Sequence, residues 1–197
     1  MFGESLSSSA THLGPPIGSS TISPMNAEND ALQILGRIWA PDAADDSIPL
    51  PVNPFSIAQR IGVKVFTASL DEGISGILVK RAGEDAEIYV HASDSPNRQR
   101  FTCAHELGHY VKRSAAGDEA WEYVEHRNLL TAQGTDSEEI YANRFAASLL
   151  MPQQAVRKLH AKLTDQRGTA PPAAALAFDF GVSADAMQYR LANLGLD

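Results

Sequence analysis

The sequence predicts an α+β fold in which helices pack around a small three-stranded sheet. Two long segments, 95–116 and 137–152, have helical boundary residues and no internal cluster of Pro and Gly. Three shorter runs ahead of them have the residue types of strands. Since 44% of the 197 residues are hydrophobic, the chain is long enough for one domain with a sizeable core and too short for a second large domain.

The N-terminal region divides into a tail and two short helices. Residues 1–25 are rich in Ser, Gly and Pro, so we expect a disordered tail ahead of a single domain over 26–197. Met25 is a second candidate start of translation, which the intact mass of the native protein would decide. A helix is predicted from 26 to the residue before Pro41, with one apolar face formed by Leu32, Leu35, Ile38 and Trp39. A second short helix is predicted over 54–61.

Three runs predict the strands of the sheet, at 63–66, 74–80 and 87–91. The second and third flank RAGEDA, a turn-forming stretch of hairpin length, so we expect these two strands to pair antiparallel. A polar, charge-rich connection is expected over 117–136, between the two long helices.

The first long helix contains the pentapeptide HELGH. Ser95 and Pro96 are a favourable N-cap and first helical residue, so this pentapeptide lies in mid-helix. His105 and His109 are four residues apart and therefore share one face, which suits two ligands of a tetrahedral zinc ion. Glu106 borders such an ion. Its carboxylate can take a proton from zinc-bound water, whose pKa falls to about 7, and deliver it to a leaving amine.

This pentapeptide pattern needs support, because it arises in about 1% of random sequences of this composition. Gly108 suits the close approach of another element, and a third ligand must exist. Glu139 and Asn143 are four apart on the second long helix. Glu139 could complete a His-His-Glu site with a fourth position for water, and Asn143 could hold the far nitrogen of a ligand histidine. Alternatively Glu138 and Glu139 complement the helix dipole, an interpretation that we keep for Glu138.

Two segments in order, RQRFTCAHELGHY and EIYANRFAASLLMP, resemble the ImmA/IrrE family of bacterial zinc metallopeptidases, and the resemblance extends over about 51–197. It implies a zincin-like catalytic core over about 51–152, followed by C-terminal, helix-turn-helix-like segments over 153–197. It also implies one zinc ion, held by His105, His109 and Glu139, with Glu106 as general base. Manganese is an alternative, since sites that contain a carboxylate accept it too.

Characterised members of that family cleave helix-turn-helix repressors, which releases genes of mobile elements or of stress responses. The resemblance therefore implies such a repressor as the protein partner. A peptidase holds its substrate extended, and an exposed sheet edge can do so by adding the peptide as a strand. We expect run 87–91 to be that edge, with Tyr89 and His91 in contact with the substrate.

Charge and cysteine content narrow the function classes. A net charge of -8 argues against direct binding of nucleic acid, and no run is long enough to span a membrane. The single cysteine, Cys103, cannot form an internal disulfide, so a cytoplasmic location is expected, and packing is its expected role.

Two other functions stay open. The segment FDFGVSADAMQYRLANLGL has the turn of a helix-turn-helix, which would suit a DNA-associated regulator. The charges over 178–197 argue against DNA binding, because the acidic residues Asp179, Asp185 and Asp197 outnumber the single basic residue, Arg190. The chain could also keep the fold and the zinc as a non-proteolytic, toxin-antitoxin-like module that binds a partner. The presence of Glu106 argues against that alternative, because metal binding alone does not require it.

Overall fold

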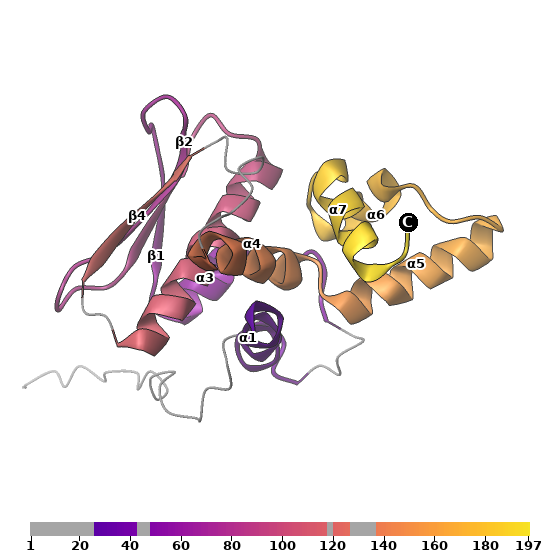
Figure 1. Ribbon diagram of the computed structural model, residues 1–197, viewed down its shortest axis with the longest axis horizontal. Coiled ribbons are helices and arrows are strands. Elements are labelled where there is room, and N and C mark those ends of the chain that lie inside the picture. Colours follow the sequence, from indigo (N-terminus) through magenta and orange to yellow (C-terminus); the bar gives the residue numbers. More distant parts are fainter. Residues whose placement is uncertain (1–25, 43–47, 118–119, 127–136) are drawn as a thin grey trace, which may run out of the picture.

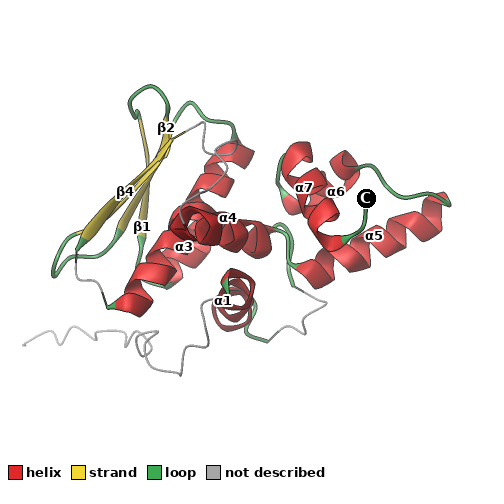
Figure 2. Ribbon diagram, viewed as in Figure 1, coloured by secondary structure: helices red, strands yellow, loops and turns green. Residues whose placement is uncertain are grey.

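The computed structural model describes residues 26–42, 48–117, 120–126 and 137–197, and for 122–126 it describes the backbone alone. The tail expected over 1–25 lies outside the described residues. The α+β class is confirmed: Figure 2 shows the helices to one side of a single sheet. Helices α5, α6 and α7 lie at the end of α4 that is remote from the sheet (Figure 1).

Among the described residues, the sheet has four strands: β1 (Lys64–Ala68), β2 (Ile74–Lys80), β3 (Glu87–His91) and β4 (Trp121–His126). The first three lie where the sequence predicts them, and β2 pairs antiparallel with β3 as expected. The fourth lies in the segment that was expected to be a polar connection, where it pairs antiparallel with β2. The sheet thus contains one strand more than the three that the sequence predicts.

The strand order β1-β3-β2-β4 makes the expectation of an edge at 87–91 wrong. The β2–β3 hairpin leaves one side of β3 open, and β1 occupies it in parallel register, with Phe66 opposite Tyr89. Chain order could not reveal this, because β1 and β3 are not consecutive. Within the part of the chain that the structure describes, β1 and β4 are the edges of the sheet.

The N-terminal helices follow their capping residues. Asn26 accepts a hydrogen bond from Glu28 N at the start of α1 (Ala27–Ile34), which continues as a π-helical turn, η1 (Leu35–Trp39). Asn53 likewise caps α2 (Pro54–Arg60). The buried face differs from the predicted one in that Leu32 is 43% exposed, because α1 packs through the smaller residues Ala27 and Ala31.

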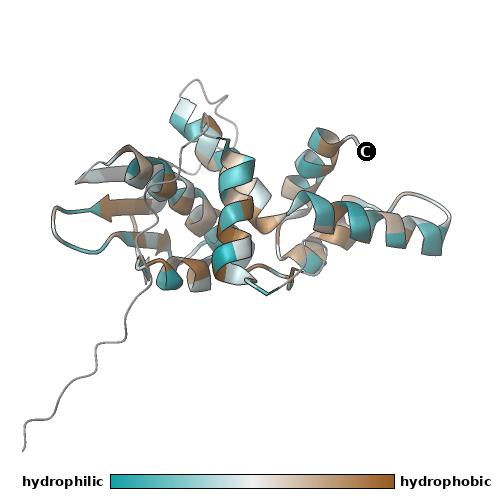
Figure 3. Ribbon diagram, turned by 90° about the horizontal axis from the view of Figure 1, so that it is seen from below, coloured by the Kyte–Doolittle hydropathy of each residue, from teal (hydrophilic) through white to brown (hydrophobic). Residues whose placement is uncertain are grey.

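Helix α3 (Pro96–Ala116) begins at the predicted N-cap, where Arg98 N donates to Ser95 Oγ, and ends at Gly117, whose φ is 80°. It packs against β2 and β3 on one side and against α4 (Ser137–Leu150) on the other. Hydrophobic and hydrophilic residues alternate along the helices (Figure 3), as expected of helices with one buried face.

The C-terminal helices are α5 (Gln153–Arg167), α6 (Ala173–Phe180) and α7 (Ala184–Leu194). The α6–α7 turn is held on α3: Asn97 Nδ2 donates to Val182 O at 3.0 Å, and Arg100 Nε donates to Gly181 O at 2.9 Å. The helix-turn-helix-like pair is thus packed on the core. Among the described residues, no helix has an apolar stretch long enough to cross a membrane.

Candidate metal centre

The two helices that carry the predicted ligands lie in backbone contact. A Cβ added at Gly108 of α3 would lie 2.9 Å from Ala142 Cα and 3.2 Å from Phe145 Cβ of α4. Real side chains do not tolerate the first of these distances, so a residue without a side chain is required here. The predicted role of Gly108 in close approach is confirmed, and α3 and α4 come near enough to share one ion.

His105, His109 and Glu139 meet at this contact, each with one possible ligand atom within 4.8 Å of the others. The two Nε2 atoms lie 3.0 Å apart, and Glu139 oxygens lie 3.3 Å from His105 Nε2 and 3.2 Å from His109 Nε2. A tetrahedron with zinc–ligand bonds of about 2.0–2.1 Å has edges of about 3.3–3.4 Å. The two histidines lie nearest to different oxygens of Glu139, and all three separations are close to the edge length of a zinc coordination tetrahedron.

The protonation of His105 also fits a metal ligand. Its Nδ1 lies 3.1 Å from Asn143 Oδ1, which is the contact expected from the sequence. An amide oxygen can only accept, so Nδ1 carries the proton and Nε2 presents its lone pair to the centre. A cation at the centre would satisfy this lone pair together with the Glu139 carboxylate, and the donor set of two imidazoles and one carboxylate suits zinc.

Glu139 is ionised at neutral pH. Contact with His105, and then with His109, holds the pKa of the Glu139 carboxyl well below its usual range, although partial burial opposes this effect. His105 and His109 are both almost fully buried, whereas the Glu139 side chain is 20% exposed. The site therefore combines two buried imidazoles with one carboxylate near the surface.

Glu106 is fully buried between α3 and β2. A Cβ added at Gly76 of β2 would lie 3.0 Å from Glu106 Oε1 and 2.4 Å from Thr102 Cγ2. Gly76 thus leaves the space that the Glu106 side chain needs. Sequence reasoning missed this residue, and its signal was a lone glycine inside a predicted strand, which often marks such a close approach.

Two further contacts of the helices that carry these residues were not predicted. Arg113, four residues after His109, donates to Glu138 Oε2 at 2.9 Å, so Glu138 joins the end of α3 to the start of α4 in addition to its place in the first helical turn. On α4, Tyr141 donates to Asp30 of α1 at 2.6 Å. Cys103 is fully buried, which agrees with the packing role expected for it.

Tyr89 and His91 do not join the other predicted site residues. Ile88 and Val90 are fully buried, and side chains alternate along a strand, so Tyr89 and His91 belong to the opposite face of β3. Tyr89 donates to Glu87 Oε2 at 2.8 Å and stacks on Phe66, and His91 Nε2 lies 3.0 Å from Leu70 O. Their expected substrate contact depended on an edge strand that β3 is not.

The helix with two histidines and an intervening glutamate, the third ligand on the next helix and the sheet beside them are typical of zinc-dependent peptidases. The chain belongs to the family described as the IrrE N-terminal-like domain (Peptidase_M78), whose family model matches residues 58–192. That family points to a metallopeptidase. No curated protein is significantly similar in sequence.

Among solved structures, a Mycobacterium tuberculosis transcriptional regulator resembles this protein with a TM-score of 0.52 and 14% sequence identity. The match covers 84% of this chain and 46% of the regulator, so the present chain spans less than half the length of that protein. At this identity the likeness shows the fold alone.

Proposed function

We propose that this protein is a zinc-dependent endopeptidase. The observation that carries the proposal is the approach of donor atoms of His105, His109 and Glu139 to within 3.0–3.3 Å of one another, close to the edge of a zinc tetrahedron. The buried carboxylate of Glu106 lies next to His105 on α3. Three protein ligands leave a fourth position open, which distinguishes catalytic from structural zinc sites.

Bound zinc would supply the Lewis acidity that activates water and polarises a peptide carbonyl. The protein supplies the proton transfers and the orientation. Asn143 holds the His105 ring through Nδ1, so that Nε2 faces the centre. Glu106 follows His105 by one residue, and we assign it the general-base role: it takes the proton of the attacking water and returns it to the leaving amine.

We place the substrate along β4, not along β3. Gly76 of β2 lies over Glu106, and β4 is the free edge directly beside β2, whereas the other free edge, β1, is two strands away. At about 4.8 Å per strand, β4 is the edge nearer to the general base. Hydrogen exchange with an uncleaved peptide bound to the Glu106→Gln variant should protect β4 amides; protection of β1 amides instead would exclude this placement.

The proposed substrate is a helix-turn-helix repressor. The family resemblance supports this substrate. The test is co-expression with the helix-turn-helix protein encoded nearest to this chain, with zinc present, and intact-mass analysis of that partner. Fragments with wild type but not with Glu106→Gln are the expected result. An intact partner that co-purifies equally with both would favour a non-proteolytic binding module.

We do not assign direct DNA binding to α6 and α7. Arg190 is the single basic residue of α7, and it is 8% exposed, with bonds to Met151 O and to Glu28 Oε1. The turn that would approach DNA is held against α3 by Arg100. A salt-dependent shift of labelled duplex DNA at micromolar protein would contradict this assignment.

A further inference from the structure

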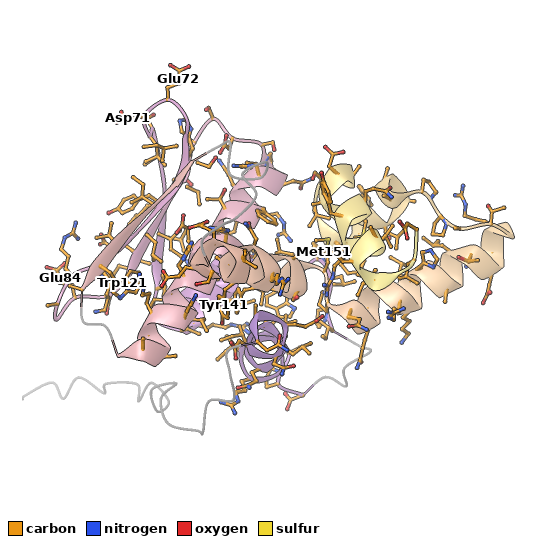
Figure 4. The ribbon with its side chains drawn as sticks, viewed as in Figure 1. Asp71, Glu72, Glu84, Trp121, Tyr141 and Met151 are labelled. Atoms are coloured by element: carbon orange, nitrogen blue, oxygen red, sulfur yellow. The ribbon has the colours of Figure 1, made fainter. Side chains whose placement is uncertain are left out.

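Helix α4 is held on two opposite faces. Glu139 and Asn143, four residues apart, lie on the face toward α3, where they reach the histidines. Tyr141 lies two residues from each, about 200° around the helix from Glu139. Its hydroxyl donates to Asp30 Oδ2 of α1 at 2.6 Å, and only 6% of the residue is exposed. Figure 4 shows Tyr141 beside α1.

We propose that the Asp30–Tyr141 hydrogen bond positions the metal ligand Glu139 by fixing the rotation of α4 about its own axis. Helix α1, which lies outside residues 58–192 of the family match, then belongs to the support of the metal centre. The inference rests on the metal-binding part of the proposed function and not on peptidase activity. Asp30 and Tyr141 act through Glu139 and do not touch the metal or the substrate.

The close contact at Gly108 does not fix this rotation by itself. The contacts between α3 and α4, including Gly108 with Ala142 and Arg113 with Glu138, lie on the side of α4 that faces α3, so they oppose a roll of α4 about its axis from that side alone. A roll of about 10° moves side-chain atoms that lie about 5–6 Å from the axis by about 1 Å. Metal–ligand distances must hold to within about 0.2 Å, so a second anchor on the far face controls how well Glu139 reaches the ion.

Other contacts keep Tyr141 in this orientation. Its ring stacks on Phe145 with centroids 6.3 Å apart, and Lys112 Nζ of α3 lies 5.4 Å from the ring centroid. Helix α1 is also tied to α7 by the ion pair between Glu28 and Arg190 at 3.0 Å. That second tie supplies a control, because it holds α1 without contacting Tyr141 or Glu139.

The test measures the zinc dissociation constant of the full-length chain by competition with a chromophoric chelator, after circular dichroism has shown that each metal-free variant is folded. Tyr141→Phe and Asp30→Ala remove the hydrogen bond and should raise the constant by about 3- to 10-fold, somewhat less than loss of a group in direct contact with a ligand. Asp30→Asn keeps an acceptor oxygen and should stay within about twofold of wild type. The zinc dissociation constant of Glu28→Gln should also stay within about twofold of wild type.

An unchanged dissociation constant in Tyr141→Phe and Asp30→Ala would overturn the proposal, and so would an equal rise in Glu28→Gln. If Tyr141→Phe does not fold, the comparison of Asp30→Ala with Asp30→Asn decides. Zinc binding as expected, without cleavage of any substrate, would remove the proposed function and leave this inference standing. A wild-type chain that binds no zinc would overturn both.

Discussion

Gly108 and Ala142 lie so close that a Cβ on the glycine would be 2.9 Å from the alanine Cα. This contact brings the helix that carries His105 and His109 against the helix that carries Glu139. A His-His-Glu centre built from two helices depends on such an approach, because the side chains have fixed reach. The glycine within the pentapeptide is thus a structural requirement of the metal centre.

Gly108→Ala should therefore weaken zinc binding by more than tenfold and lower stability by about 1–3 kcal/mol, since the new methyl group pushes α4 away. Chelator competition and thermal unfolding measure the two effects. Gly36→Ala is the matched control: no atom lies within 4 Å of its added Cβ, so it should leave zinc affinity unchanged. Equal zinc affinity in wild type and Gly108→Ala would show that the two helices do not set the site.

Asn143→Ala should weaken zinc binding by about 10- to 100-fold, the usual effect of losing a group that orients a ligand histidine. The reason is that His105 Nδ1 loses its acceptor and its ring loses its orientation. Asn143→Asp keeps an acceptor and should retain most of the affinity. Calorimetric titration of the metal-free variants with zinc measures their affinities. An Asn143→Ala variant that binds zinc as tightly as wild type would contradict the assigned contact.

Gly76→Ala should reduce peptide cleavage at least tenfold while zinc stays bound. The added methyl group would press on Thr102 and on Glu106 Oε1, which displaces the proposed general base and not the proposed ligands. Zinc content, measured by mass spectrometry, and cleavage rate, measured on the same sample, distinguish displacement of Glu106 from loss of the metal ligands. Loss of zinc together with activity would mean that Gly76 supports the whole centre.

Tyr141 predicts a pH dependence of stability. Burial first, and then the hydrogen bond to Asp30, raise the pKa of its hydroxyl far above the usual value of about 10. The pKa of the Tyr141 hydroxyl is higher in the folded chain than in the unfolded chain. The contribution of the protonated hydroxyl to the free energy of unfolding is therefore complete below pH 10 and is lost as the pH rises toward the folded pKa. Wild type should lose about 1.4 kcal/mol per pH unit above 10 relative to Tyr141→Phe. Denaturant unfolding at pH 8 and pH 11 measures this difference, and a constant difference would contradict it.

Local signals predicted the elements well where boundary residues agreed. Ser95 and Pro96 gave the start of α3, and four-residue spacing brought Glu139 and Asn143 to the histidines. The helix start and the shared face of Glu139 and Asn143 follow from helix geometry within a few turns. The meeting of that face with the histidines of α3 is a tertiary contact, which was inferred from the need for a third ligand.

The features that were missed depend on pairing between distant segments. β4 lies in a segment rich in charge, so its Trp121 and its β-branched and aromatic neighbours were outweighed by polar composition. The place of β3 between β1 and β2 is a property of strand order, which the pattern of each strand does not encode. The Asp30–Tyr141 contact joins residues 111 positions apart, and no spacing rule reaches that far.

Anomalous diffraction at the zinc edge would locate the ion in crystals grown in the presence of one equivalent of zinc. We expect a single strong peak within about 2.0–2.2 Å of Nε2 of His105, Nε2 of His109 and one oxygen of Glu139, with Glu106 outside the ligand set. A peak elsewhere, or none at this position under saturating zinc, would contradict the proposed ligand set.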